Sequence, residues 1–195
     1  MTIVLATQNP GKIAEIRDLL PAHWNITTAH EQGVTEDIPE TGDTLEANAE
    51  QKARYIYEHT GLPALADDTG LEIDALNGAP GVYSARYAGA NKNNENNIDK
   101  VLQEMGNTSN RAARFRTVMA LIDHRGIHFF KGVAEGSIAR ERLMGSHGFG
   151  YDPIFIPEGH TRSFAQMSAS EKSNISHRGK AVRAFGRHIE GTAKQ

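Results

Sequence analysis

The stretch Ala64-Leu65-Ala66-Asp67-Asp68-Thr69-Gly70 decides how the rest of the chain is interpreted. An apolar run of strand length leads into two adjacent carboxylates. Because neighbouring side chains of a strand point to opposite faces, Asp67 and Asp68 can face one pocket only if the strand has ended before them. One Asp can otherwise face a ligand, and carboxylates at the carboxyl end of a strand commonly hold Mg²⁺ beside phosphates. Asp, Thr and Gly are also typical of a polar turn, so a metal site and a plain turn both stay open here.

Length and composition set wide bounds on the function. The 195 residues suit one domain, or one core with two lobes. A net charge of -3 provides no basic field that would attract nucleic acid. The absence of cysteine excludes disulfides, thiolate nucleophiles and Cys-ligated zinc. The apolar run within residues 1–7 is too short for a signal peptide or a membrane span, so we expect a cytoplasmic protein that binds neither nucleic acid nor membrane.

The chain opens with Ile3-Val4-Leu5-Ala6, which predicts a buried strand followed by a polar turn and a helix. Asn9 is a good N-cap, and Pro10 fits the first helical position, where its missing N–H costs nothing. Lys12 then lies in the first turn, where free backbone N–H groups and the helix dipole favour phosphate. The P-loop spacing is absent, and many α/β proteins begin in this way, so the stretch alone is weak support for a phosphate site.

A second helix is expected to start with a capping box formed by Asp43 and Glu46 and to end at Gly61. Asn48 and Lys52 lie four residues apart on one face of this helix. Without further context, the default prediction for such a pair is a solvated face.

Two carboxylates bracket this helix and the strand that follows it. Glu40 lies in the loop before the helix, and Asp68 lies at the end of the strand. We therefore expect Glu40 and Asp68 to converge at one rim, where they would suit Mg²⁺.

The middle of the chain predicts mostly strands. Residues 71–76 alternate as a half-buried strand, and residues 113–123 and 127–138 predict a hairpin. Between them, apolar residues at helical spacing from Ile98 to Met105 predict a helix. Its apolar stripe indicates core packing or a dimer face rather than a cofactor site.

Three glycines surround His147, Phe149 and Tyr151 in the segment 145–153. Glycine lets a backbone approach a ligand closely, and a Phe in such a loop is a stacking platform for a base. The glycines can instead serve only the turn, and their spacing leaves both interpretations open.

A final helix is predicted after Ser176, which can cap it. Its apolar face holds Val182, Phe185 and Ile189. The cations around its start are Lys172, His177, Arg178 and Lys180. With Lys12 they would grip a polyphosphate, whereas a local charge run by itself is usually a solvated helix start.

Six stretches taken together resemble the inosine triphosphate pyrophosphatase family, hydrolases of non-standard purine nucleoside triphosphates. The first three are Thr7-Gln8-Asn9-Pro10-Gly11-Lys12, Glu40-Thr41-Gly42 with Asn48-Ala49 and Lys52-Ala53, and Ala66-Asp67-Asp68-Thr69-Gly70-Leu71. The others are Gly78-Ala79-Pro80-Gly81-Val82-Tyr83-Ser84-Ala85-Arg86-Tyr87, Gly148-Phe149-Gly150-Tyr151-Asp152-Pro153-Ile154-Phe155, and Glu171-Lys172 with Ile175-Ser176-His177-Arg178-Gly179-Lys180-Ala181. They follow the family's order and span nearly the whole chain, which makes the series a strong signal.

This resemblance implies an α/β fold with a long, mixed, bent central sheet and flanking helices, in which two lobes surround a nucleotide cleft. A single domain of this kind is expected to span residues 1–195. The resemblance also implies a homodimer whose substrate is a purine nucleoside triphosphate.

The implied reaction is Mg²⁺-dependent cleavage of ITP, dITP or XTP between the α and β phosphates, which gives the monophosphate and pyrophosphate. By motif match, Asp68 is the catalytic proton acceptor and a metal ligand, and Glu40 is the second metal ligand. The match implies that substrate is bound by Thr7, Gln8, Asn9, Pro10, Gly11, Lys12, Thr69, Phe149, Gly150, Tyr151, Asp152, Lys172, His177 and Arg178. Donors from His177, Arg178 or loop N–H groups would favour a 6-oxo purine over adenine.

Two of the departures from the resemblance bear on the site. His147 stands where many relatives have Gly, and Ala47 stands where many place Glu, which leaves the number of metal ions open. One alternative is a Maf-like pyrophosphatase that acts on pyrimidine or modified nucleotides. The other is a nucleotide-binding sensor without turnover, for which Ala47 is the only hint.

Overall fold

The computed structural model describes residues 2–192. Its strands are β1 (Thr2–Leu5), β2 (Asn25–Thr28), β3 (Ala64–Ile73), β4 (Pro80–Gly81), β5 (Ala112–Asp123), β6 (Gly126–Ile138) and β7 (Phe155–Pro157). Its α-helices are α1 (Pro10–Leu19), α2 (Leu45–Thr60), α3 (Asn94–Met105), α4 (Ala169–Ile175) and α5 (His177–Thr192). None of the helices between residues 2 and 192 is long and apolar enough to cross a membrane.

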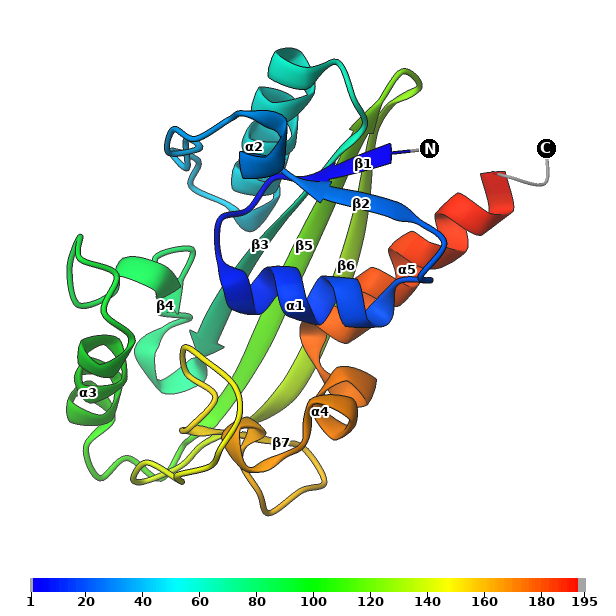
Figure 1. Cartoon of the computed structure of the whole chain (residues 1–195). Coiled ribbons are helices and arrows are strands. Elements are labelled where there is room, and N and C mark those ends of the chain that lie inside the picture. The colour runs from blue at the N-terminus through cyan, green and yellow to red at the C-terminus, as the bar shows by residue number, and fades with distance from the viewer. Residues whose placement is uncertain (1, 193–195) are drawn as a thin grey trace. The chain divides into compact units, whose positions relative to one another are not determined.

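The strands form one sheet in the order β2-β1-β3-β5-β6-β7, with β4 paired to β3 (Figure 1). β1 runs parallel to β2 and β3, whereas β4 and β7 run antiparallel to their partners. The predicted mixed sheet with flanking helices and the predicted hairpin of β5 and β6 are therefore confirmed.

The described chain divides into two compact units. Unit 1 holds residues 2–68, 117–132 and 178–192, and unit 2 holds residues 69–116 and 133–177. The single domain expected over residues 1–195 stays a prediction, and its ends, residues 1 and 193–195, lie outside the described residues.

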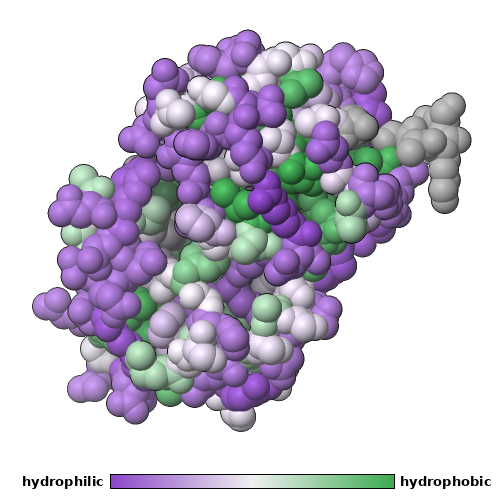
Figure 2. All heavy atoms as spheres, in the orientation of Figure 1, coloured by the Kyte–Doolittle hydropathy of each residue, from purple (hydrophilic) through white to green (hydrophobic). Residues whose placement is uncertain are grey.

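Unit 1 is built around the buried strand β1, whose Ile3, Val4 and Leu5 are almost fully covered. Helices α1 and α5 contribute Ile16 and Phe185 to the same core and lie side by side (Figure 1). Figure 2 shows a mostly hydrophilic face, with hydrophobic atoms exposed mainly around α1 and the adjoining part of α5. The apolar spacing predicted for both helices is thus the spacing that buries them.

The start of α1 is the one predicted from sequence. The Asn9 side chain accepts hydrogen bonds from the backbone N–H groups of Gly11 (2.9 Å) and Lys12 (3.3 Å). Pro10 takes the first helical position. The turn after β1 therefore presents Lys12 from a capped helix N-terminus.

The start of α2 was predicted one residue too early. Thr44, not Asp43, is the N-cap, and its hydroxyl accepts from the backbone N–H of Ala47 at 3.1 Å. Thr44 has the extended backbone that an N-cap needs, so the helix begins at the next residue. Glu46 pairs with Lys131 at 2.6 Å instead of closing a capping box. Gly61 ends the helix with φ +65°, as expected.

β3 is longer than predicted, because it does not end at the two aspartates. It continues through Thr69 and Gly70 to Ile73, so the polar-turn alternative is wrong. Residues 71–73 are strand as predicted, but as the end of β3, and residues 74–76 form a 3-10 helix instead. β3 pairs with β1 at Leu65 and with β4 at Leu71. Pairing on both sides of the aspartates keeps the segment extended despite its turn-forming residues.

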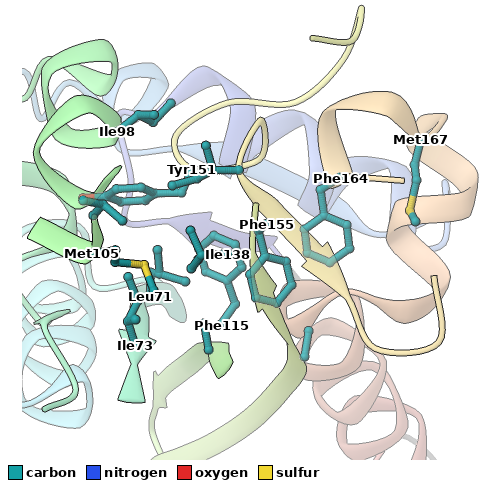
Figure 3. Close-up of a cluster of buried hydrophobic side chains, with 14 residues drawn as sticks. Leu71, Ile73, Ile98, Met105, Phe115, Ile138, Tyr151, Phe155, Phe164 and Met167 are labelled. Carbon is teal, nitrogen blue, oxygen red and sulfur yellow. The ribbon is translucent and has the colours of Figure 1, made fainter. Parts of the chain in front are cut away.

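Unit 2 has a core rich in aromatic rings, shown in Figure 3. Phe115 packs on Phe155 with ring centroids 4.7 Å apart, and Phe155 packs on Phe164 at 5.1 Å. The α3 stripe from Ile98 to Met105 is buried in this core, so core packing explains it.

One helix of unit 2 was not predicted. α4 starts with a capping box in which Ser168 accepts from the backbone N–H of Glu171 and the Glu171 side chain accepts from that of Ser168. The Ser-x-x-Glu signature was available in the sequence as a start signal.

Candidate active site

Lys52 brings Glu40 and Asp68 together in unit 1. Its ammonium nitrogen lies 2.7 Å from Glu40 Oε1 and 3.0 Å from Asp68 Oδ1. Carboxylates that reach the same ammonium are close enough to share a single cation. The convergence expected for Glu40 and Asp68 is therefore found.

Asn48 adds a second link to the same place. Its amide nitrogen donates to Asp68 Oδ2 at 3.2 Å, and its amide oxygen accepts from the backbone N–H of Gly42 at 2.7 Å. A Cβ atom at residue 42 would lie 2.8 Å from the Ala47 Cβ and 2.9 Å from the Asn48 Oδ1, so the loop needs glycine for this close approach. Asn48 thereby ties the loop after Glu40 to Asp68.

The solvated face predicted for Asn48 and Lys52 was wrong. The two side chains belong to residues only 2 % and 4 % exposed. They lie one helical turn apart, so both reach the carboxylate of Asp68. A polar pair at this spacing looks the same in the sequence whether its helix face is exposed to solvent or buried. Only the position of β3 shows that this face is buried.

Asp67 contacts a different set of side chains. Its Oδ2 lies 3.1 Å from Lys12 Nζ and accepts from Arg178 Nη2 at 3.2 Å and Nε at 3.3 Å. Arg178 Nη1 also donates to Glu15. Because β3 continues through both aspartates, strand alternation separates the contacts of Asp67 from those of Asp68.

Burial and neighbouring charges shift the pKa values of Asp67, Lys12 and Lys52. Burial alone would raise the pKa of Asp67, but the cations of Lys12, Arg178 and Lys52 outweigh it and lower that pKa well below its usual range. Burial lowers the pKa of Lys12 despite Asp67. For Lys52, burial is outweighed by Asp68, Glu40 and Asp67, which raise its pKa. Asp67 and Lys52 are therefore kept ionised.

The turn predicted to bind phosphate, residues 7–11, directly precedes Lys12 in the chain. Gln8, Asn9 and Pro10 are exposed, and Gln8 donates to the backbone oxygen of Glu36 at 2.9 Å. The Thr7 hydroxyl accepts from the backbone N–H of Asn9 at 3.3 Å. Gly11 is partly buried, as is Thr69, which follows Asp68 in β3 and belongs to unit 2.

Unit 2 brings together Lys172, Asp152 and Phe149. The Lys172 ammonium nitrogen lies 2.6 Å from Asp152 Oδ2 and 5.0 Å from the centre of the Phe149 ring. The same carboxylate oxygen accepts from the backbone N–H of Phe149 at 2.8 Å. Lys172 and Asp152 are buried, whereas Phe149 is half-buried.

The glycines of this loop serve close packing within unit 2. Gly148 has φ +87°, and a Cβ there would lie 2.3 Å from Asp152 Oδ2. A Cβ at Gly145 would lie 1.8 Å from the backbone oxygen of Ala165. Gly150 has φ +59° and open space around it. Close packing therefore accounts for both Gly145 and Gly148, and Gly148 also has a backbone conformation that favours glycine.

Two other predicted substrate residues are packed into the core of unit 2. The Tyr151 hydroxyl donates to the backbone oxygen of Ser84 at 2.8 Å, and burial raises the pKa of Tyr151. The His177 ring stacks on Phe115 with centroids 4.5 Å apart and planes 17° apart. Both residues therefore support the shape of this unit.

No cluster of three or more His, Asp or Glu side chains that could hold a metal ion occurs within residues 2–192. The carboxylates of Glu40 and Asp68 are nevertheless a hard oxygen donor set, which suits Mg²⁺ when phosphates complete its shell.

The sequence analysis did not assign Lys52, Asn48 or Glu15 to this site.

Comparison with known proteins gives one consistent answer. The chain is 50% identical over 185 residues to a dITP/XTP pyrophosphatase of Flavobacterium psychrophilum, covering 95% of this chain and 97% of that protein. It is 54% identical over 181 residues to a dITP/XTP pyrophosphatase of Porphyromonas gingivalis, covering 92% and 93%. The solved structure of a HAM1 protein from Coxiella burnetii aligns with a TM-score of 0.89 at 45% identity, covering 98% of this chain and 99% of that one. A model of the Ham1 family matches residues 3–188, and the chain belongs to the Ham1 family.

Proposed function

We propose that this protein hydrolyses non-standard purine nucleoside triphosphates, namely ITP, dITP and XTP, to the monophosphate and pyrophosphate. The relatives named dITP/XTP pyrophosphatase, at 50% and 54% identity, support this activity. The observation that carries it is the meeting of Glu40, Asp68 and Lys52 beside the charges of Asp67 and Lys12. Such a group of fixed charges is what hydrolysis at a phosphate mainly requires.

The proposed cofactor is Mg²⁺, held by Glu40 and Asp68. Both carboxylates already reach one cation, the Lys52 ammonium, so the residues present fit the ion. When bound, Mg²⁺ offsets the charge of the phosphates and makes a bound water more acidic.

Asp68 is the proposed proton acceptor. It takes a proton from the attacking water as the water oxygen bonds to the α phosphorus, and the bond from that phosphorus to the oxygen bridging to the β phosphate breaks. Lys52 and Asn48 hold the two Asp68 oxygens in place. This leaves the carboxylate fixed for proton transfer rather than free to rotate.

Lys12 is proposed to bind the phosphates, together with the turn of residues 7–11. The backbone N–H groups at the start of α1 and the exposed side chains of Gln8 and Asn9 suit phosphate oxygens. Arg178, which the motif also assigned to substrate, holds Asp67 and Glu15 with its guanidinium. Its proposed contribution is therefore positive charge rather than direct contact.

Phe149 of unit 2 is proposed to stack on the purine. Lys172 lies over its ring and is held by Asp152, which also fixes the Phe149 backbone. Stacking accepts any purine, so selection of a 6-oxo base falls to hydrogen-bond donors. We assign that selection to the loop N–H groups of Gly150 and its neighbours. His177, which the motif match also proposes as a substrate residue, has its ring packed on Phe115, so we assign it a supporting role.

The deciding experiment is product analysis with ITP, XTP, dITP, ATP and GTP in the presence of Mg²⁺. We expect IMP and pyrophosphate from ITP, and little product from ATP or GTP. IDP and orthophosphate would mean that a different bond is cut. A pyrimidine preference would favour the Maf-like activity, and tight ITP binding without product would favour a sensor.

Three further expectations accompany this proposal. The resemblance implies a homodimer, the short apolar run within residues 1–7 predicts a cytoplasmic location, and the net charge of -3 predicts no binding of nucleic acid. Light scattering on the eluting protein gives the mass in solution, and a mass near 21.3 kDa, that of one chain, would contradict the dimer.

A further inference from the structure

Asp67 lies next to Asp68 in β3, but the metal site proposed above leaves its role unexplained. Asp67 is 1 % exposed, and its Oδ2 forms ion pairs with Lys12 and Arg178. The carboxylate of Asp68 accepts hydrogen bonds from Asn48 and Lys52 instead. A buried carboxylate is costly unless it is paired, so a specific task is expected for Asp67.

A set of ionic contacts surrounds Asp67 and joins three elements of unit 1. Arg178, at the start of α5, contacts Asp67 of β3 with two nitrogens and Glu15 of α1 with a third. Glu15 and Lys12 lie three residues apart on α1 and share a face. Arg178 is 2 % exposed, whereas the Lys12 side chain keeps 15 % exposure. Lys12 is therefore the cation of this set that a phosphate can reach.

Lys12 depends on Asp67 for a counter-ion. Lys52 of α2 and Arg178 of α5 act on Lys12 as like charges, and Asp67 and Asp68 of β3 act as opposite charges. Among these groups, Asp67 is the one with an ion-pair distance to Lys12, 3.1 Å. Without it, an ammonium partly withdrawn from water would face two further cations.

We propose that Asp67 is a positioning residue, which keeps the Lys12 ammonium charged and directed at the substrate phosphates and which binds no metal. The proposal rests on the function proposed above and deepens it. Two adjacent aspartates then have separate tasks: Asp68 serves the metal and the water, and Asp67 serves the phosphate-binding cation.

A double-mutant cycle tests this coupling. Asp67→Asn keeps the shape and removes the charge, and we expect it to raise the KM for ITP roughly 10- to 100-fold, the effect of losing a charged hydrogen bond. In a Lys12→Gln background, the same substitution should change KM by less than about 2-fold. Additive effects of the two substitutions would overturn the proposal.

The Mg²⁺ dependence separates the two aspartates. Asp68→Asn should raise the Mg²⁺ concentration for half-maximal activity, whereas Asp67→Asn should leave it unchanged. An equal rise in both variants would make Asp67 a metal ligand and overturn the proposal.

The pH profile gives a readout that a purely structural role would not move. Loss of the Asp67 charge lowers the pKa of Lys12 further, so the alkaline limb of kcat/KM should move to lower pH in Asp67→Asn. Asp67→Glu keeps the charge and should keep the limb. An unmoved limb in Asp67→Asn contradicts the proposal.

The matched control is Asp123→Asn, which removes another buried carboxylate of unit 1 bonded to an arginine, Arg125. It should leave KM and the alkaline limb unchanged. If Asp67→Asn does not fold, Asp67→Ser, which also removes the carboxylate, takes its place in the cycle with the same expected loss of coupling. If the wild type does not turn over ITP, only the proposed function is contradicted. The coupling of Asp67 and Lys12 can then be tested with the same cycle, in which calorimetry measures the binding of inorganic pyrophosphate.

Discussion

The two units hold a buried lysine in different ways. In unit 1, Lys52 lies between two carboxylates, Glu40 and Asp68. In unit 2, Lys172 pairs with the carboxylate of Asp152 and has two aromatic rings nearby, those of Phe149 and Phe164. The first arrangement fixes the charges to which we assign the reaction at the phosphates, and the second places a positive charge beside an aromatic surface. Substitutions at Lys52 and its two carboxylates should therefore lower kcat, and those around Phe149 should raise KM.

The largest effect is expected at Asp68. Asp68→Asn removes the proposed proton acceptor and one of the two proposed metal carboxylates, so kcat with ITP should fall about 10²- to 10⁴-fold. Steady-state kinetics at saturating Mg²⁺ measure this. Asp74→Asn, at an exposed aspartate just after β3, is the control and should keep normal kcat. Full turnover by Asp68→Asn would remove Asp68 from the chemistry.

The next effect tests Lys52. Lys52→Met removes the ammonium that orients Asp68 and Glu40, and kcat should fall on the order of 10²-fold. Lys131→Met is matched to it, because Lys131 also pairs with a glutamate of unit 1, Glu46, but on the surface. A surface pair contributes little, so Lys131→Met should behave as wild type. Equal loss in both variants would mean that general charge, not this site, matters.

A smaller effect of another kind is expected in unit 2. Phe149→Ala removes the proposed stacking surface, so KM for ITP should rise about 5- to 100-fold while kcat changes little. Phe129→Ala, at an exposed Phe of β6, is the control. A loss confined to kcat would place Phe149 in the reaction step and break the contrast between the two units.

The smallest effect is expected at His188, whose burial makes the stability of the protein depend on pH. The rings of His188 and His128 lie 4.5 Å apart in unit 1, and burial, with His128 and Arg125, lowers the pKa of His188 although Asp123 opposes this. Between the two pKa values the unfolded state binds more protons, so this stability is present above the unfolded pKa, near 6.5, decreases as pH falls below it, and is lost as pH falls through the lower folded-state pKa.

Thermal unfolding between pH 7.5 and 5.5 measures this loss. His188→Gln should show a flatter dependence of Tm on pH than the wild type, whereas His59→Gln, at an exposed histidine, should not. An unchanged slope in His188→Gln would show that His188 does not carry the effect.

Local sequence signals predicted several helices and some of their ends. Asn9 and Pro10 predicted the start of α1, Gly61 predicted the end of α2, and the apolar spacing predicted α3 and α5. These signals work because caps, glycine conformations and helical periodicity act over a few residues. The bracketing of one helix by Glu40 and Asp68 also predicted that the two carboxylates meet.

The tertiary structure alone decided which polar residues are buried and what they contact. Thr69 and Gly70 favour a turn, yet pairing of β3 on both sides holds them extended and sends Asp67 and Asp68 to different partners. Asn48 and Lys52 have a surface pattern but are covered, because their face of α2 meets the carboxylate of Asp68. A carboxylate far along the chain determines whether a lysine is solvated or buried, and no local pattern carries that information.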